Sequence, residues 1–214
     1  MKSTKGISHN VINRLPRYLR YLTDVQEQGG ERISSREIAD ALNTTPSQVR
    51  QDFTLFGSYG VQGYGYQVDF LIANIKRILG LSKQHQVIVV GVGGFGRALL
   101  EHMEFERYNF SVCAAFDVDP EVVGKVINGI TVYDMEDLET VVGDTKIDMA
   151  MLTVSKAAAE KVAKRLHRMK IPGILNFTNV ELNLKADDIF VQNVSLLDSL
   201  FSLSYYLEEN NLQL

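Results

Sequence analysis

The stretch Val87-Ile88-Val89-Val90-Gly91-Val92-Gly93-Gly94-Phe95-Gly96 (residues 87–96) joins an apolar run to closely spaced glycines. The apolar run predicts a buried strand, and Gly91, Gly93 and Gly96 fit G-x-G-x-x-G, a pattern that leads from a strand into a helix. The first glycine permits a tight turn, the second lets a pyrophosphate approach the backbone, and the third lets the helix pack on the sheet. Because a helix N-terminus offers N–H donors to phosphates, this stretch predicts a dinucleotide site.

Strands and helices alternate on both sides of this stretch. We expect strands over residues 86–90, 111–116, 130–133, 147–153, 173–177 and 189–193, and helices over 94–103, 135–142 and 156–169. Continuous apolar strands separated by helices are typical of a parallel sheet covered on both faces. The prediction for residues 81–193 is therefore an α/β domain with a Rossmann-type, doubly wound parallel sheet.

Asp117 follows the second strand, 21 residues after Gly96. An acidic residue at this spacing accepts hydrogen bonds from the adenosine ribose hydroxyls. Asp119 adds a second negative charge, and the next basic residue is Lys125, so a 2′-phosphate would be repelled and NAD(H) is predicted over NADP(H). The alternative for Asp117 is a helix or turn cap. The predicted cofactor-binding residues are Gly91, Val92, Gly93, Gly94, Phe95, Gly96, Asp117, Val118, Thr153, Val154 and Asn176, of which the last three, at strand ends, fit a cap or core role equally well.

Residues 35–50, SREIADALNTTPSQVR, read as a short helix, a tight turn and a second helix. Ser34 or Ser35 suits the first N-cap, Asn43 suits a left-handed residue after the first helix, and Pro46 suits the first position of the second. This is the helix-turn-helix pattern, whose second helix enters the major groove of DNA. That helix exposes Ser47, Gln48, Arg50 and Gln51, which we predict to bind DNA. The alternative is a helical hairpin with no role in DNA binding.

The segments around residues 35–50 complete a predicted winged-helix domain over residues 1–80. An amphipathic helix is expected over 8–28, bent or interrupted near Pro16, and a second helix over 68–79. The glycine- and aromatic-rich residues 56–66 predict a wing, the alternative being a plain linker. Residues 1–80 carry a net charge of +3 and residues 81–214 one of −7, which suggests that the N-terminal part meets a polyanion. We add Arg14, Arg17, Tyr59 and Gln62 to the predicted DNA-binding residues.

Other features bear on compartment and chemistry. The sequence has no apolar run of eighteen residues and no secretory signal, and its single cysteine, Cys113, is expected to be buried in an apolar strand, so the cytoplasm is the expected compartment. One cysteine and four scattered histidines give no metal-ligand spacing, and no metal is predicted. No Tyr-x-x-x-Lys pair is present, and no room remains for a substrate domain, so no catalytic residue is predicted. Residues 194–214 are expected to hold a C-terminal helix with a broad apolar face.

The motifs taken together resemble the Rex family of bacterial redox-sensing transcriptional repressors over essentially the whole chain. The resemblance is carried by RLPRY (14–18), QVRQD (48–52), FGSYG (56–60) with Gly63 and Gly65-Tyr66, the glycine motif of residues 91–96, FDVDP (116–120) and GILNF (173–177). It implies a winged helix, a Rossmann domain, and a C-terminal dimerisation helix exchanged between two subunits. It also implies operator binding when NADH is scarce, release when NADH rises, and targets among respiratory and fermentative genes.

The resemblance implies a base contact for Arg50, and it has three departures. The family often has a basic residue at Gln62, an acidic residue at Ser195 and a tyrosine at His102; the last two positions lie near the nicotinamide in relatives. We expect NAD⁺ and NADH to be distinguished by Thr153, Val154, Asn176 and residues 195–197. Two alternatives stay open at this point: a small NAD-dependent oxidoreductase with an accessory DNA-binding module, and a DNA-binding regulator whose Rossmann domain holds another ligand, such as an acyl-CoA or a sugar nucleotide.

Overall fold

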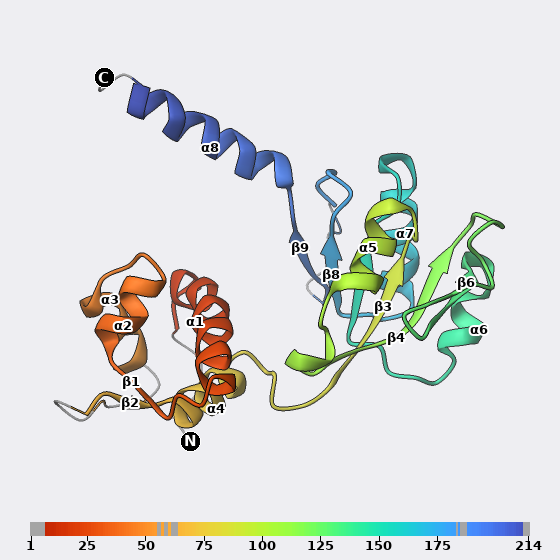
Figure 1. Cartoon of the computed structure of the whole chain (residues 1–214). Helices are drawn as coiled ribbons and strands as arrows, with labels where there is room; N and C mark the ends of the chain where they lie inside the picture. Colours follow the sequence, from red (N-terminus) through yellow and green to blue (C-terminus); the bar gives the residue numbers. More distant parts are fainter. Residues whose placement is uncertain are drawn as a thin grey trace. The chain divides into compact units, whose positions relative to one another are not determined.

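The computed structural model describes residues 7–54, 57, 60, 64–182, 184 and 188–211. The chain divides into two compact units, Met1–Lys83 and Gln84–Leu214 (Figure 1). No helix within the described ranges has the length and apolar content needed to cross a bilayer.

The first unit is helical, with one short ladder of strands. Its helices are α1 (His9–Glu27), α2 (Ser35–Ala41), α3 (Pro46–Thr54) and α4 (Val68–Ile78), and its antiparallel strands are β1 (Arg32–Ile33) and β2 (Tyr66–Gln67). The core between the helices holds fully buried apolar side chains from all four, among them Leu15, Leu22, Ile38, Phe53, Leu71 and Ile75. The predicted helix-turn-helix is therefore part of a packed domain.

Local sequence explains where these helices begin and end. Ser34 caps α2 in a capping box: its hydroxyl accepts from the Glu37 N–H at 3.1 Å, and the Glu37 carboxylate accepts from the Ser34 N–H at 2.8 Å. Asn43 takes the left-handed conformation predicted for the turn, with φ of 50°. Helix α1 continues through Pro16, so an interruption there is wrong, and the expected bend stays a prediction. Most of the predicted wing, including Tyr59 and Gln62, lies outside the described residues.

A buried carboxylate ties α1 to α3. Asp52 is 1% exposed and accepts two hydrogen bonds from the Arg14 guanidinium, both 2.7 Å long. The Tyr18 hydroxyl donates to the same carboxylate at 2.8 Å and the Gln48 amide at 2.9 Å. Burial on its own raises the pKa of Asp52, but the hydrogen bonds from Arg14 and Tyr18 outweigh it and hold that pKa below its usual value.

The second unit contains a seven-stranded sheet with the order β5-β6-β4-β3-β7-β8-β9. The strands are β3 (His85–Val90), β4 (Phe110–Asp117), β5 (Val126–Ile127), β6 (Ile130–Asp134), β7 (Met149–Leu152), β8 (Gly173–Asn176) and β9 (Phe190–Asn193). All neighbours are parallel except β5 and β6, an antiparallel pair at one edge. Strand β6 was predicted, whereas β5 was not. Following the chain, β4 and β6 are added on one side of β3, and β7, β8 and β9 are then added on the other side. The carboxyl ends of β3 and β7 thus meet at a switch point of the topology, where ligands bind in such sheets.

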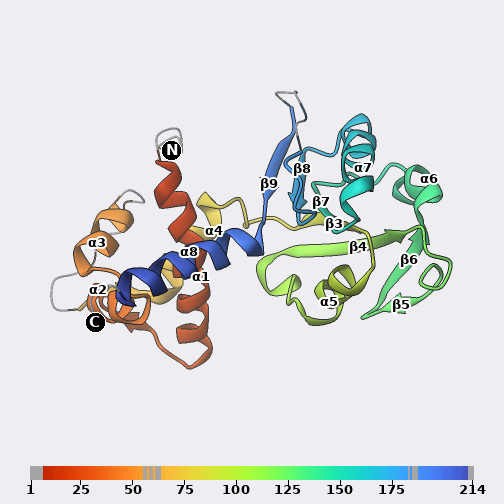
Figure 2. The same ribbon diagram turned by 90° about the horizontal axis from the view of Figure 1, so that it is seen from above.

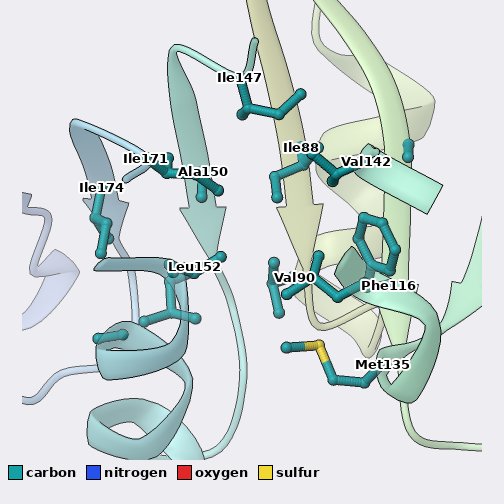
Figure 3. Close-up of a cluster of buried hydrophobic side chains, with 14 of the residues drawn as sticks. Ile88, Val90, Phe116, Met135, Val142, Ile147, Ala150, Leu152, Ile171 and Ile174 are labelled. Atoms are coloured by element: carbon teal, nitrogen blue, oxygen red, sulfur yellow. The ribbon is translucent and has the colours of Figure 1, made fainter. Parts of the chain in front are cut away.

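Helices cover both faces of this sheet (Figures 1 and 2). They are α5 (Gly94–His102) on one face and α6 (Leu138–Val142) and α7 (Lys156–Arg168) on the other, with short 3₁₀ turns η1 (Glu106–Tyr108) and η2 (Met135–Asp137). Alternate residues of each strand face opposite ways: Ile88 and Val90 join the cluster under α6 and α7 (Figure 3), whereas Val87 and Val89 join the cluster under α5. The doubly wound sheet predicted from the alternating elements is confirmed.

Cys113 departs from the prediction of a buried thiol. Val87 pairs with Val112 and Ile88 with Ala114, so Cys113 is the extra residue of a β-bulge between β3 and β4. The bulge changes which side chains of β4 face inward, and Cys113 is exposed.

The last helix, α8 (Leu196–Asn211), is almost wholly uncovered. Every side chain from residue 196 to 209 is exposed. The apolar ones include Leu200 at 57%, Phe201 at 67% and Leu207 at 57% exposure. So much contiguous apolar surface is unusual on a monomer.

Replacing Asp52 by Asn should lower the free energy of unfolding by about 3 kcal/mol, because the Arg14 charge loses its buried partner. The pKa of Asp52 is lower in the folded protein than in the unfolded chain, where an aspartate has a pKa of about 4. The contribution of Asp52 to the free energy of unfolding is therefore fully present above about pH 4 and is lost as the pH falls through the pKa of the folded protein. Urea unfolding followed by circular dichroism at pH 7 and below pH 4 measures both effects. The exposed Asp40→Asn, whose carboxylate lies 4.0 Å from Arg36, is the matched control and should change stability little. Equal stability of the Asp52→Asn protein and the wild type at pH 7 would contradict this role.

Candidate functional site

The glycine loop after β3 contains two positions at which the backbone leaves no room for a side chain. Gly91 has φ of +97°, and a Cβ at this position would lie 2.7 Å from the carbonyl carbon of Thr153. A Cβ on Gly96 would lie 2.0 Å from the Gly91 carbonyl oxygen. Both positions therefore require glycine, the first for its turn and the second for the contact between α5 and the loop, as the motif predicts.

Gly93 and Gly94 lie between these two positions, and their surroundings differ. Apart from chain neighbours, no heavy atom of the described residues comes within 4 Å of a Cβ built on either. Gly93 is the N-cap of α5, and none of the described side chains caps this helix. The first N–H groups of α5 thus border open space at the switch point, which is the arrangement that a pyrophosphate needs.

Asp117 connects the end of β4 to the glycine loop. Its carboxylate accepts from the backbone N–H of Val92, from that of Val118 at 2.7 Å and from that of Asp119 at 2.9 Å. A carboxylate has about four acceptor positions, so capacity remains for a ribose hydroxyl. Val118, beside it, is 75% exposed and offers apolar surface next to the expected ribose position.

Thr153, Val154 and Asn176 lie at or just after the carboxyl ends of β7 and β8, as predicted, but their side chains are engaged. The Thr153 hydroxyl donates to the Gly91 carbonyl at 2.6 Å, and Val154 packs against the core under α7. Asn176 is 2% exposed; its amide donates to the Val180 carbonyl and to Asn193, and its oxygen accepts from Thr178. These side chains brace the backbone at the strand ends, and their contact with a ligand stays a prediction.

An aromatic pair crosses the switch point and was not predicted. The ring of Phe95, in the first turn of α5, lies 5.0 Å from the ring of Phe177, which directly follows β8. Since β7 separates β8 from β3, this contact reaches across the carboxyl ends of the strands. In the sequence, Phe177 appears as the last residue of the predicted strand 173–177 and of the GILNF motif, and its partner Phe95 cannot be identified from these patterns.

The histidines of the second unit lie at the ends of secondary-structure elements. His85 begins β3, and His102 and His167 stand at the C-terminal ends of α5 and α7, which run back toward the amino ends of the strands. Within the described part of the chain, no three His, Cys, Asp or Glu side chains gather as a metal site would require. The crevice is built to hold a ligand by its backbone.

The predicted DNA-binding residues fall into three groups. Ser47, Arg50 and Gln51 are exposed on α3, as the second helix of the motif requires. Gln48 and Arg14 are bound to Asp52, and Arg17 donates to the Leu42 carbonyl at 2.8 Å, so these three hold the domain together. Tyr59 and Gln62 lie outside the described residues. The exposed face of α3 is thus the candidate surface for base contacts.

Comparisons with known proteins agree along the chain. Residues 82–180 match the family model described as a CoA binding domain, and residues 6–54 match the one described as a putative DNA-binding protein N-terminus. The chain is 43% identical over 213 residues to the redox-sensing transcriptional repressor Rex of Caldicellulosiruptor saccharolyticus, covering 100% of this chain and 97% of that one. It is 42% identical to that of Thermoanaerobacter pseudethanolicus, covering 99% of this chain and 93% of the relative.

Solved structures show the same likeness. The crystal structure of RSP, a Rex-family repressor, in complex with β-NAD⁺ and operator DNA matches with a TM-score of 0.85 at 41% identity, covering 96% of this chain and 94% of that one. RSP in complex with β-NADH matches with a TM-score of 0.84 at 39% identity, covering 97% of each. These matches confirm the predicted fold class and a regulator in place of an oxidoreductase. The chain belongs to the Rex family of redox-sensing transcriptional repressors.

Proposed function

We propose that this chain represses transcription in the cytoplasm by binding operator DNA as a homodimer through α3, and that it leaves the operator when NADH rises relative to NAD⁺. The observation that carries the proposal is the loop of residues 91–96, in which two glycines are sterically required and the two between them border open space. RSP, which matches this chain over both units, has been crystallised with NAD⁺ and operator DNA and with NADH.

The acidic residues after β4 support NAD(H) over CoA, although residues 82–180 match a CoA binding domain. The adenosine ribose of CoA carries a 3′-phosphate and that of NADP(H) a 2′-phosphate. Either phosphate would come close to Asp117 and to the exposed carboxylate of Asp119. The ribose of NAD(H) has free hydroxyls that donate to a carboxylate.

Recognition of the redox state needs a second part of the site. NAD⁺ and NADH share the ADP half, and they differ in the charge and planarity of the nicotinamide. A nearly complete switch needs about 5 kcal/mol of differential affinity between the two protein states. We place the nicotinamide at the ends of β7 and β8, where Thr153 and Asn176 fix the backbone, near residues 195–197 at the start of α8.

The exposed face of α8 supports the homodimer. We propose that α8 is exchanged between two subunits, which buries its leucines and Phe201. A two-fold dimer presents two copies of α3 to successive major grooves, about 34–36 Å apart. NADH would then act by changing that spacing.

The decisive experiment titrates operator binding with NADH, NAD⁺ and NADPH in parallel. NADH should release the wild type, whereas NAD⁺ and NADPH should not. Asp117→Ala should shift the NADH response to at least tenfold higher concentration, because the ribose contact is lost, while operator affinity without nucleotide is unchanged. If the wild type binds its operator equally well with every nucleotide, the proposed switch is wrong; if Asp117→Ala responds as the wild type does, the ligand assignment is wrong.

Replacing Arg50 by Ala should weaken operator binding by about 1–3 kcal/mol and relax the base preference at one position of each half-site. Binding to operators with single base changes, measured by fluorescence anisotropy, resolves the two effects. Arg77→Ala, on α4, removes the same charge from the same unit and should leave base preference unchanged. Wild-type specificity in the Arg50 variant would show that α3 does not read the operator through this residue.

Placing a charge at Leu200 should prevent dimerisation, because a carboxylate in the apolar face of α8 cannot be buried without a partner. Sedimentation velocity of Leu200→Glu is expected to show a monomer where the wild type is a dimer. Leu200→Met keeps the volume and apolar character and should dimerise normally. A dimeric Leu200→Glu protein would place the subunit interface elsewhere.

A further inference from the structure

The first unit contains a hollow of about 460 Å³ that none of the predicted contacts uses. It lies between the β1–β2 ladder, the start of α2 and the recognition helix α3. Its wall includes Arg32, Ser34, Ser35, Arg50, Tyr64 and Tyr66. Arg50 belongs to the predicted reading surface, so the hollow adjoins the place where DNA is expected, and Arg32 is the other basic side chain in its wall.

We infer that Arg32, held in place by Tyr64, binds a backbone phosphate of the operator beside the groove that α3 enters. This inference rests on the proposed function, which it extends by a contact that carries affinity without reading sequence. Phosphate contacts of this kind fix the register of a protein on the duplex.

The contact between Arg32 and Tyr64 orients the guanidinium. The Arg32 Nη1 donates to the Tyr64 carbonyl oxygen at 2.9 Å, and the Arg32 Cζ lies 5.8 Å from the centroid of the Tyr64 ring. Tyr64 is 70% exposed, and Arg32 is also exposed. A guanidinium has five N–H donors in a fixed plane, so this single bond leaves donors for an anion. Because the ring and the carbonyl already restrict the side chain, less entropy is lost when a phosphate binds.

Two glycines near this contact allow the backbone to pass close to neighbouring atoms. Gly65, with φ of +69°, would carry a Cβ only 2.5 Å from the Ile33 carbonyl oxygen, so glycine is required where β2 meets β1. A Cβ on Gly60 would lie 2.9 Å from the ring of Tyr66. The β1–β2 pairing, in which Ile33 lies opposite Tyr66, brings the chain next to Arg32 close to the chain that holds Tyr64.

Charge in the hollow favours an anion of modest size. The two arginines are offset by Glu37, whose carboxylate is held by the Ser34 N–H at 2.8 Å as part of the α2 cap. Arg50 Nη1 donates to the neutral Ser35 hydroxyl at 3.1 Å, so its positive charge adds to that of Arg32 in the hollow. The net positive charge and the position next to α3 suit a DNA phosphate.

The test uses full-length Arg32→Gln and two duplexes of equal length, the operator and an unrelated sequence, across a series of salt concentrations without NADH. Loss of one phosphate contact should weaken binding to both duplexes by the same factor, roughly 5- to 10-fold at 0.1 M salt, and lower the slope of log K against log[salt] by about 1. Arg32→Lys keeps the charge and should retain the slope, with a smaller loss of affinity. Tyr64→Phe should bind as the wild type does, and Tyr64→Ala should lose part of the affinity.

Arg77→Gln, an equal loss of charge on α4, is the matched control and should leave the slope unchanged. Wild-type affinity and slope in Arg32→Gln would overturn the inference, and so would a loss confined to the operator, which would make Arg32 a base reader. A wild type that binds operator but ignores NADH would refute the proposed switch and leave this test of Arg32 intact. Melting curves of the exposed Arg32 variants should superimpose on that of the wild type.

Discussion

The structure depends on one close approach, between Gly96 in the first turn of α5 and the carbonyl oxygen of Gly91. Any side chain at residue 96 would begin 2.0 Å from that oxygen, and any side chain at residue 91 would meet the backbone of Thr153. Because of this contact, α5 packs closely against the carboxyl end of β3, and the first N–H groups of α5 lie at the switch point of the sheet. Thr153 reinforces it by donating to the same Gly91 oxygen, so β3, β7 and α5 are locked at one place.

The glycine loop is proposed to bind the part of the ligand that does not change, and recognition of the redox state requires other residues. Under the proposed function, backbone N–H groups and the Asp117 carboxylate recognise phosphate and ribose, which NAD⁺ and NADH share, and so they supply affinity without discrimination. Under the same proposal, the difference between the two forms is sensed at the ends of β7 and β8 and at the start of α8, where the chain leaves the sheet. A rigid anchor next to an uncovered helix lets a small change in the ligand bias a larger rearrangement.

Residue patterns in the sequence predict the parts of this protein that depend on local rules. The glycine spacing, the apolar strands, the Ser34 cap and left-handed Asn43 each follow from neighbours in the chain. The edge strand β5 was missed although Asn128-Gly129, both with positive φ, is a hairpin turn signal between it and β6. The engagement of Arg14 by Asp52, 38 residues away, and the bulge at Cys113 depend on tertiary contacts that no local pattern contains.

The Asp52 cluster gives Arg14 and Gln48 a structural role, while their predicted contact with DNA stays a prediction. Arg14 and Tyr18 on α1 and Gln48 on α3 converge on one carboxylate that is 1% exposed, so α1 and the recognition helix behave as one body. Reshaping α3 alone would break several charge-assisted hydrogen bonds inside the domain, at a cost of about 1.5–3 kcal/mol each. Moving the whole unit leaves all of them intact. In the proposed homodimer, a nucleotide switch therefore costs less free energy when it changes the spacing of two intact DNA-binding units than when it distorts either unit.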